Sequence, residues 1–193
     1  MALTGALLDR EKERSVATES DSTLVERAAG GDGESFTELC RRYYTAMVAI
    51  GHAIIGDRHL AEDAAQQAFA KAALNLPKLR QADQFGGWLA AICRNEARDL
   101  TRARRDVPTE AAPMTRPAEA ERYEASEAVR AGLKRLSAEA REAVFLRFYD
   151  GLSYEQMSAV LGISEQAING RLRRAKRKLA EYLRRDGFGE VSI

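Results

Sequence analysis

Apolar residues recur at helical spacing through most of the chain, and nowhere do apolar and polar residues alternate as they would in a half-buried strand. Across residues 23–105 the apolar positions lie three or four apart, beginning at Leu24 and continuing past Tyr43. Residues 60–76 are rich in alanine, which favours a helix, and Pro77 then ends that helix. The pattern predicts an all-α domain over residues 23–105.

A second helical stretch, residues 119–185, contains two helices joined by a tight turn. Ser153 and Gln156 have the spacing of a capping box at the start of the first helix, and Gly162 follows its last apolar residue. Ser164 then caps the second helix. One apolar stripe runs along that helix: Ile168, Leu172, Ala175 and Leu179. A short helix followed by a longer, basic one predicts a helix-turn-helix, and the alternative is a helical hairpin with a solvated charged face.

The segment that precedes this motif supplies its core. Ser137 is placed to cap a helix there. Four apolar residues follow, and we expect the two later helices to pack on them: Val144, Phe145, Leu146 and Phe148.

Three of the four prolines lie within ten residues, in a segment without helical periodicity, residues 106–118. Proline favours an extended path, so we expect this segment to be a flexible linker between two small helical domains. Residues 1–22 form a polar, acidic tail that we expect to be disordered, with a short helix near residues 6–14 as the alternative. Residues 186–193 are a short C-terminal tail.

The net charge of +1 conceals a strong segregation of charge. Residues 1–40 hold 4 basic and 9 acidic residues, whereas residues 164–185 hold 8 basic and 2 acidic residues. Local positive potential is what a DNA-binding surface needs. No apolar run reaches the length of a membrane span, and the N-terminus lacks the order of a signal peptide. We therefore expect a cytoplasmic protein without membrane insertion.

The second helix of the predicted helix-turn-helix carries the candidates for DNA recognition. Early residues of such a helix reach base edges, and later ones usually meet phosphates. Gln166 and Asn169 can pair with adenine, and Arg173 can pair with guanine. Gly170 lowers helix propensity but permits a closer approach to DNA. The candidates for phosphate contacts are Arg171, Arg174 and Arg177.

A second basic row lies on the last helix of the first domain. Four arginines are spaced at four, four and three residues: Arg94, Arg98, Arg102 and Arg105. Residues 94–105 hold 5 basic and 2 acidic residues, which suits a phosphate backbone. Asn95 lies beside this row, in reach of a base or a phosphate. The alternative is a solubilising face.

The sequence gives no sign of catalysis. There is no glycine-rich phosphate loop, no metal-ligand spacing and no nucleophile with a nearby base, so we expect neither an enzyme nor a cofactor. Cys40 and Cys93 sit in apolar helical contexts, typical of small buried hydrophobes. The alternatives are a redox-sensitive thiol or a zinc site with His52 or His59.

Two blocks of sequence carry a resemblance to a known family. The first is AEDAAQQAFAKAALNL followed by FGGWLAAICRNEARDLTRARR, and the second is LSAEAREAVFLRFYDGLSYEQMSAVLGISEQAINGRLRRAKRKLAEYL. In this order and separation they resemble bacterial group 4 (extracytoplasmic function, ECF) sigma factors of the sigma-70 class. The resemblance implies a sigma-2 domain over residues 23–105, which binds the clamp of core RNA polymerase and opens the −10 element. It implies a sigma-4 domain over residues 119–185, which reads the −35 element and contacts the flap.

The resemblance also assigns roles to single residues. The clamp contact falls on Asp63, Gln66 and Gln67, although the family usually has glutamate at Gln67. The loop after Pro77 would hold a flipped base of the melted non-template −10 strand, and its polar residues are Lys78, Arg80, Gln81, Asp83 and Gln84. At Asn169 and Gly170 the family more often has lysine and serine, so the −35 sequence preference is open.

Some alternatives remain at this stage. Trp88 could stack on a base, but it lies four residues from Ile92 on the predicted core face, which favours packing. The resemblance implies an anti-sigma factor as a further partner, and no small-molecule substrate. The competing function is a stand-alone transcriptional regulator, which would have no need of the Asp63–Gln67 motif.

Overall fold

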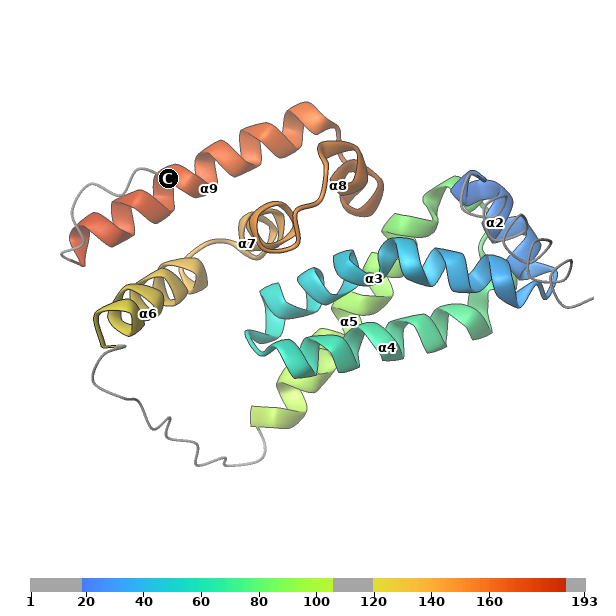
Figure 1. Cartoon of the computed structure of the whole chain (residues 1–193), viewed down its shortest axis with the longest axis horizontal. Helices are drawn as coiled ribbons and strands as arrows, with labels where there is room; N and C mark the ends of the chain where they lie inside the picture. The colour runs from blue at the N-terminus through green and yellow to red at the C-terminus, as the bar shows by residue number, and fades with distance from the viewer. Residues whose placement is uncertain (1–18, 106–119, 187–193) are drawn as a thin grey trace, which may run out of the picture.

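The computed structural model describes residues 19–105 and 120–186, and every regular element in that part of the chain is a helix (Figure 1). The first group comprises α2 (Asp21–Ala29), α3 (Gly33–Ile55), α4 (Arg58–Asn75) and α5 (Phe85–Arg105). Two short 3-10 turns, η1 (Leu76–Lys78) and η2 (Ala82–Gln84), join α4 to α5. The second group comprises α6 (Ala120–Lys134), α7 (Ala138–Val144), the π-helical turn η4 (Phe145–Tyr149), α8 (Tyr154–Leu161) and α9 (Glu165–Arg185).

Part of what the sequence predicts falls outside the described residues. This holds for most of the acidic tail, including the alternative helix at residues 6–14, for the linker at 106–118 and for the C-terminal tail from residue 187. In the described ranges, no helix is long and apolar enough to cross a membrane.

Short polar residues start the helices of the first group. The side chain of Asp32 accepts hydrogen bonds from the backbone N–H groups of the first turn of α3, and Asp57 does the same for α4. These carboxylates satisfy donors that have no partner inside the helix. Gly56, with φ of 75°, closes α3 in the left-handed conformation that glycine adopts without strain.

The helices α3 and α4 approach each other closely because both present small residues at the contact. A Cβ atom at Gly51 would lie 3.1 Å from the Cα, Cβ and carbonyl oxygen of Ala61. Most buried positions of α4 are alanine: Ala61, Ala64, Ala65, Ala68 and Ala72. The alanine-rich segment therefore forms a helix, as predicted, and serves as a packing surface. It ends at Asn75, and Pro77 lies in the first turn of η1.

The predicted caps of the second group are confirmed. Ser137 caps α7, and Ser153 with Gln156 forms a complete capping box at the start of α8. Gly162 ends α8 with φ of 66°, and Ser164 caps α9. These caps fix the turn between α8 and α9.

The two groups of helices pack against each other and share one hydrophobic core. Leu146, Met157 and Val160 of the second group lie in the same buried cluster as residues of α3 and α5. The predicted core position of Phe148 is wrong, because its side chain is 56% exposed. Successive helical residues point about 100° apart, so four apolar residues within five positions cannot all face one core.

Candidate nucleic-acid interface

Helix α9 packs through one face and leaves the opposite face open. The stripe that the spacing predicted is buried: Ile168, Leu172, Ala175 and Leu179. Leu183 extends the stripe, and Met157 and Val160 of α8 are buried as well. The hydroxyl of Ser158 donates a hydrogen bond of 2.8 Å to the carbonyl of Ile163, which ties the turn to α8. The two helices therefore form one unit with a fixed outer surface.

The outer face of α9 holds most of the residues predicted for the −35 element, whereas Arg171 lies beside the buried stripe, three residues after Ile168. Five are exposed: Gln166, Asn169, Arg173, Arg174 and Arg177. Gly170 and Arg171 are half-buried. A Cβ at Gly170 would meet the guanidinium of Arg174 at 3.3 Å, the flexible end of a side chain. Packing within the protein therefore leaves room for a side chain at Gly170.

The loop between α4 and α5 alternates between anchored and exposed residues. Leu79 and Ala82 are partly buried and pack against the core. The polar residues predicted to hold the −10 base are all exposed: Lys78, Arg80, Gln81, Asp83 and Gln84. Two apolar anchors and two 3-10 turns thus fix the backbone while the polar side chains face outward.

The basic row of α5 continues beyond this loop. Arg98 and Arg102 are exposed. An Nη atom of Arg98 lies 3.3 Å from the side-chain oxygen of Asn95, and one of Arg102 lies 3.3 Å from Asp99. These contacts join exposed neighbours on one helix and contribute little stability, so both arginines can exchange them for phosphates. The side chain of Arg105 lies outside the described part of the structure.

Arg94, the first residue of the predicted row, differs from the others. Its guanidinium lies 2.7 Å from Oε1 of Glu142 on α7, and the two side chains are only 23% and 11% exposed. The second helical group therefore occupies a predicted DNA contact of the first.

A groove of about 360 Å³ lies between α4 and α5 beside the loop. It brings together Lys78 and Asn95, two predicted DNA contacts, with Trp88. Trp88 packs against the core, as favoured, and its ring centroid lies 6.0 Å from that of Phe85. Because it also lines the groove, its outer edge remains available to a ligand.

Sequence reasoning missed three residues that line this groove. Nζ of Lys71 lies 2.6 Å from a carboxylate oxygen of Glu96, which is 5% exposed. Asn75 donates to the carbonyl of Lys71 and accepts a hydrogen bond of 2.9 Å from Lys78. The spacing of four between Lys71 and Asn75, just before the loop, was the available signal.

The three residues predicted to contact the polymerase clamp share the outer side of α4. Asp63, Gln66 and Gln67 are all exposed. The alanines between and beside them face the core, so this helix shows a polar surface on one side only.

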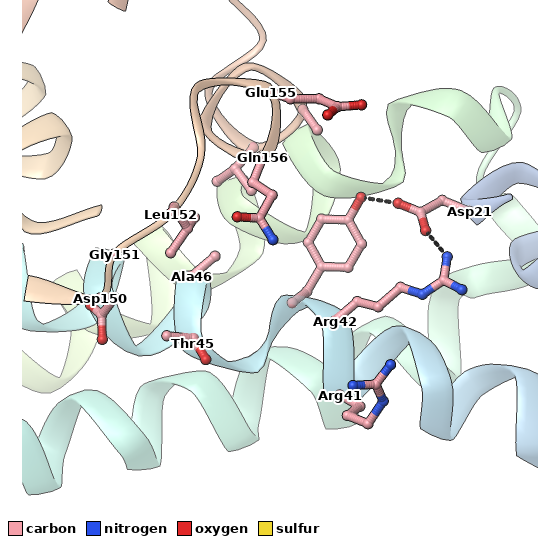
Figure 2. Close-up of a pocket in the computed structure, with 13 residues that line it drawn as sticks. Asp21, Arg41, Arg42, Thr45, Ala46, Asp150, Gly151, Leu152, Glu155 and Gln156 are labelled. Atoms are coloured by element: carbon pink, nitrogen blue, oxygen red, sulfur yellow. Dashed lines mark hydrogen bonds and ion pairs between the residues drawn. The ribbon is translucent and has the colours of Figure 1, made fainter. Parts of the chain in front are cut away.

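A cavity of about 680 Å³ lies at the seam between α3 and α8 (Figure 2). Arg41 and Arg42 line it from the first group, and Glu155 and Gln156 line it from the second. The hydroxyl of Tyr43 donates a hydrogen bond to Asp21 at one wall, and burial raises the pKa of Tyr43. The cavity depends on the contact between the two groups.

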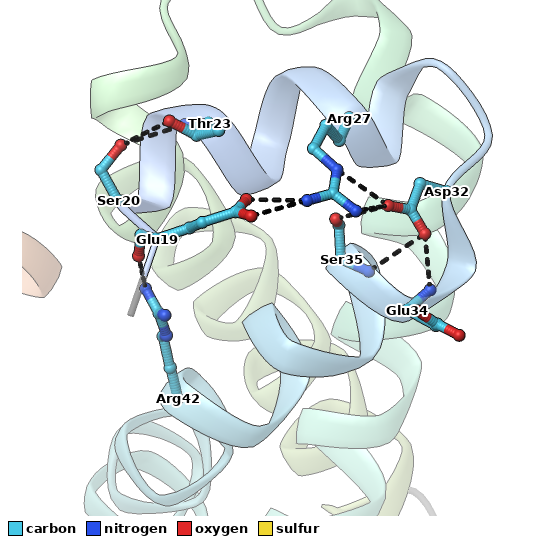
Figure 3. A network of polar contacts seen from close by, with 8 residues as sticks. All are labelled: Glu19, Ser20, Thr23, Arg27, Asp32, Glu34, Ser35 and Arg42. Carbon is cyan, nitrogen blue, oxygen red and sulfur yellow. Dashed lines mark hydrogen bonds and ion pairs between the residues drawn. The ribbon is translucent and has the colours of Figure 1, made fainter. Parts of the chain in front are cut away.

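A network of charged side chains fastens α2 to α3 (Figure 3). The guanidinium of Arg27 lies 2.8 Å from Glu19 and 2.6 Å from Asp32. Arg42 donates a hydrogen bond of 2.8 Å to the backbone carbonyl of Glu19. Hydrogen bonds from Ser35 and Arg27 lower the pKa of Asp32 to about 2. The network thus holds α2, and with it the start of the described chain, on α3.

Cys93 is buried and Cys40 is partly buried, and both are reduced. Burial raises the pKa of Cys40 to about 11 and that of Cys93 to about 12, so the thiols stay protonated. Sγ of Cys93 lies 3.3 Å from the carbonyl oxygen of Met47. Among the residues that the structure describes, no group of three His, Cys, Asp or Glu side chains is placed to hold a metal ion.

Two family models match the chain over most of the described helices. One is described as "Sigma-70 region 2" and matches residues 39–107. The other is described as "Sigma-70, region 4" and matches residues 126–179, which include the helix-turn-helix. The second match favours the helix-turn-helix over a simple helical hairpin.

Curated relatives extend this similarity over most of the chain. It is 32% identical over 184 residues to the ECF RNA polymerase sigma factor BldN of Streptomyces coelicolor, covering 88% of this chain and 70% of that protein. It is 34% identical over 161 residues to a Xanthomonas campestris pv. campestris protein named "Probable RNA polymerase sigma factor RfaY". That alignment covers 77% of this chain but only 40% of the relative.

Solved structures of sigma factors also resemble this fold. CnrH, in complex with the cytosolic domain of CnrY, is 28% identical with a TM-score of 0.58, covering 88% of this chain and all of CnrH. The sigma factor RpoE from Bartonella quintana, in complex with the anti-sigma factor NepR, is 25% identical with a TM-score of 0.50. That alignment covers 79% of this chain and 99% of RpoE.

Proposed function

The chain belongs to the ECF type of the sigma-70 family, and from this premise we propose how its surfaces function. Members of the family are non-enzymatic subunits that direct transcription initiation by RNA polymerase. It binds RNA polymerase and DNA. In the proposal, α9 reads the −35 element, the loop and α5 hold the −10 element, and α4 binds the polymerase clamp. The open polar and basic face of α9 is the observation that carries the proposal.

The −35 assignment follows from position along α9. Gln166 and Asn169 lie in the first two turns, where side chains reach base edges, and their amides match the paired donor and acceptor of adenine. Arg173 lies one turn further and offers the two parallel donors that guanine accepts. Arg171, Arg174 and Arg177 flank these residues and bind phosphates, which fixes the register of the helix on the duplex.

The −10 assignment places the melted strand over the loop and the groove. Unstacking a base costs a few kcal/mol, which the pocket must offset by stacking and hydrogen bonds. The groove offers Trp88 for an aromatic contact with the base, and Asn95 and Lys78 as polar partners. The exposed Arg98 and Arg102 then hold the adjoining backbone. Gln81 and Gln84 of the loop supply both donors and acceptors for the base edge.

The remaining partners are proteins. Asp63, Gln66 and Gln67 on α4 bind the clamp, and the second domain contacts the flap. The similarity to RpoE, solved with an anti-sigma factor, supports an anti-sigma partner for this chain as well. In this proposal the protein acts in the cytoplasm, where its polymerase works.

The test is transcription by core RNA polymerase on a promoter library with randomised −35 and −10 elements. We expect specific run-off products only when this protein is added, with both elements selected. Salt-sensitive binding to duplex DNA without core polymerase, and no added initiation with it, would overturn the proposal in favour of a stand-alone regulator.

A further inference from the structure

The groove between α4 and α5 contains a charged pair that the assignments above leave unused. Nζ of Lys71 on α4 lies 2.6 and 2.7 Å from the two carboxylate oxygens of Glu96 on α5. Glu96 is 5% exposed, whereas the side chain of Lys71 is 55% exposed. Both residues line the groove together with Trp88 and Asn95. A nearly buried carboxylate is therefore part of the lining of a surface assigned to DNA.

Neither stability nor phosphate binding accounts for this carboxylate. A buried ion pair typically stabilises a protein no more than apolar residues of similar volume in its place. A carboxylate also repels phosphate, so Glu96 does not suit the backbone of the −10 strand. The edge of a base, in contrast, carries N–H donors that a carboxylate accepts. The chemistry of Glu96 therefore fits a base rather than the backbone.

The pair keeps hydrogen-bonding capacity for such a base. Each carboxylate oxygen of Glu96 accepts one hydrogen bond from Lys71 and has a second lone pair. Nζ of Lys71, on a half-exposed side chain, keeps a further N–H donor. An acceptor and a donor thus lie side by side, as the Watson–Crick edge of an extruded base requires.

Asn75 holds a cation at the rim of the same groove. Its side-chain N–H donates a hydrogen bond of 2.8 Å to the carbonyl of Lys71, and its oxygen accepts one of 2.9 Å from Nζ of Lys78. Both ends of the amide are engaged, so the exposed Lys78 is held where it attracts the phosphate of an extruded nucleotide. Trp88 and Ile92 supply the apolar part of the lining.

We infer that Glu96, oriented by Lys71, selects the captured −10 base by accepting a hydrogen bond from an exocyclic amino group. The inference rests on the proposed function, because it concerns the base that the groove holds. Adenine, cytosine and guanine carry such a group, and thymine does not. The ring N–H of thymine lies between two carbonyl oxygens, so its approach brings an oxygen against the carboxylate. The groove therefore takes an amino-bearing base and rejects thymine.

The test compares the binding of short labelled oligonucleotides of deoxycytidine and deoxyuridine to the full chain by fluorescence anisotropy. Deoxyuridine replaces the exocyclic amino group with a carbonyl oxygen and adds no methyl group. We expect deoxycytidine to bind about tenfold more tightly. Deoxyadenosine oligonucleotides should also bind more tightly than deoxyuridine, and their affinity relative to deoxycytidine identifies which of the two amino-bearing bases the groove prefers. Equal affinities for deoxycytidine and deoxyuridine, or no binding of any oligonucleotide at low salt, overturn the inference.

Glu96→Gln tests the carboxylate itself. An amide of the same shape accepts from an amino group and also donates to a carbonyl, so the preference for deoxycytidine over deoxyuridine should fall close to one. The matched control is Asp99→Asn, which makes the same charge change at an exposed position one turn later on α5. It should change both affinities alike and leave their ratio unchanged. A ratio that Glu96→Gln leaves at the wild-type value overturns the inference.

Lys71 is a positioning residue in this account, and its variants give an independent test. Lys71→Met removes the ammonium group that orients Glu96 and should reduce the preference for deoxycytidine. Lys71→Arg keeps a cation beside the carboxylate and should retain most of it. A purely structural role would lower the stability of Lys71→Met, followed by circular dichroism, without changing the ratio of the two affinities, and that result contradicts the inference.

The oligonucleotide measurement needs neither promoter nor polymerase. A failure of run-off initiation therefore removes the proposed function and leaves the base preference of the groove standing by itself. In the opposite case, a Glu96→Gln holoenzyme that initiates and selects the same −10 sequence as wild type overturns the inference and leaves the proposed function intact.

Discussion

At the scale of single residues, the proposed recognition of the −35 element depends on side chains of α9 that face away from the core. We predict that Arg173→Ala weakens binding to a selected −35 duplex by about 1–3 kcal/mol and relaxes the preference at one base pair. Fluorescence anisotropy with the selected duplex and its single-base variants measures both effects. Arg184→Ala, at an exposed position near the end of the same helix, should change binding little. An equal loss in both variants would contradict the assignment.

The close approach of α3 and α4 also depends on one residue. Gly51→Ala would push a methyl group to within 3.1 Å of backbone atoms of Ala61, which cannot move away as a flexible side chain can. We predict a loss of about 1–3 kcal/mol in the free energy of unfolding, measured in urea. Gly33→Ala is the matched control, because no atom lies within 4 Å of its added methyl group. A control as destabilised as Gly51→Ala would show that close packing is not the cause.

At the scale of elements, both α3 itself and its attachment to α2 depend on ionised carboxylates. Arg41 and Arg42 lower the pKa of Glu38 to about 2, and Ser35 and Arg27 lower that of Asp32 to about 2. Groups whose pKa is lowered by folding stabilise the folded state above their ordinary pKa values. This contribution is lost as the pH falls from about 4.5 towards 2.

We therefore predict that the melting temperature drops steeply between pH 5 and pH 3, as followed by circular dichroism. Asp32→Asn should melt lower than wild type at pH 7, because it removes the ion pair with Arg27, and should lose less on acidification. A wild-type melting temperature that stays constant down to pH 3 would contradict this role of the network.

The elements that the sequence could predict are those set by local signals. Ser153, Gln156 and Gly162 specify the ends of α8 through hydrogen bonds within a few residues, so their spacing was sufficient. The stripe of α9 was predictable because one side of that helix is buried by its neighbours throughout. Phe148 was mispredicted because an apolar run does not say which of its members faces inward, and that depends on how η4 packs on α3.

At the scale of the whole molecule, the interface between the two groups of helices is the feature that sequence patterns could not predict. Arg94 reads as one of four similar arginines, and only the fold places Glu142, 48 residues away, beside it. The groove also joins Lys71 and Glu96 across two helices. Such pairings depend on tertiary packing rather than on spacing along the chain.

The contact between the two groups of helices should respond to pH through His52 on α3, whose ring packs against Phe145 and Tyr149 of η4. Burial lowers the pKa of His52, and the nearby Arg58 lowers it further. Nδ1 of this ring is buried without a hydrogen-bond partner among the described residues. Separation of the two groups of helices would expose the ring and restore its ordinary pKa. The packed state therefore binds fewer protons, and the contact weakens as the pH falls below about 6.5.

The other charged groups around this ring act less strongly or at lower pH. Asp57 raises the pKa of His52 and Arg130 lowers it, both more weakly than burial does. Burial raises the pKa of Asp150, so protonation of that carboxyl favours the contact between the two helical groups and opposes the effect of His52. His52 titrates from the ordinary pKa nearer neutrality, so we expect its effect first on acidification.

We predict that the distance between the domains in the free protein lengthens from pH 7.5 to pH 5.5. His52→Phe keeps an aromatic ring against Phe145 and Tyr149 and should remove most of that change. Fluorescence energy transfer between dyes at Leu74→Cys on α4 and Glu181→Cys on α9, both exposed positions, measures both proteins. The same pH response in wild type and His52→Phe would contradict this prediction.

The measurement that tests the division of labour most directly is selection of promoters by run-off transcription with three holoenzymes. They contain the wild-type protein, Arg173→Ala, and Gln84→Ala in the loop. We predict that Arg173→Ala changes the selected −35 sequence alone, and that Gln84→Ala changes the −10 sequence alone. If Arg173→Ala altered the −10 preference, or Gln84→Ala the −35 preference, the assignment of one promoter element to each domain would be contradicted.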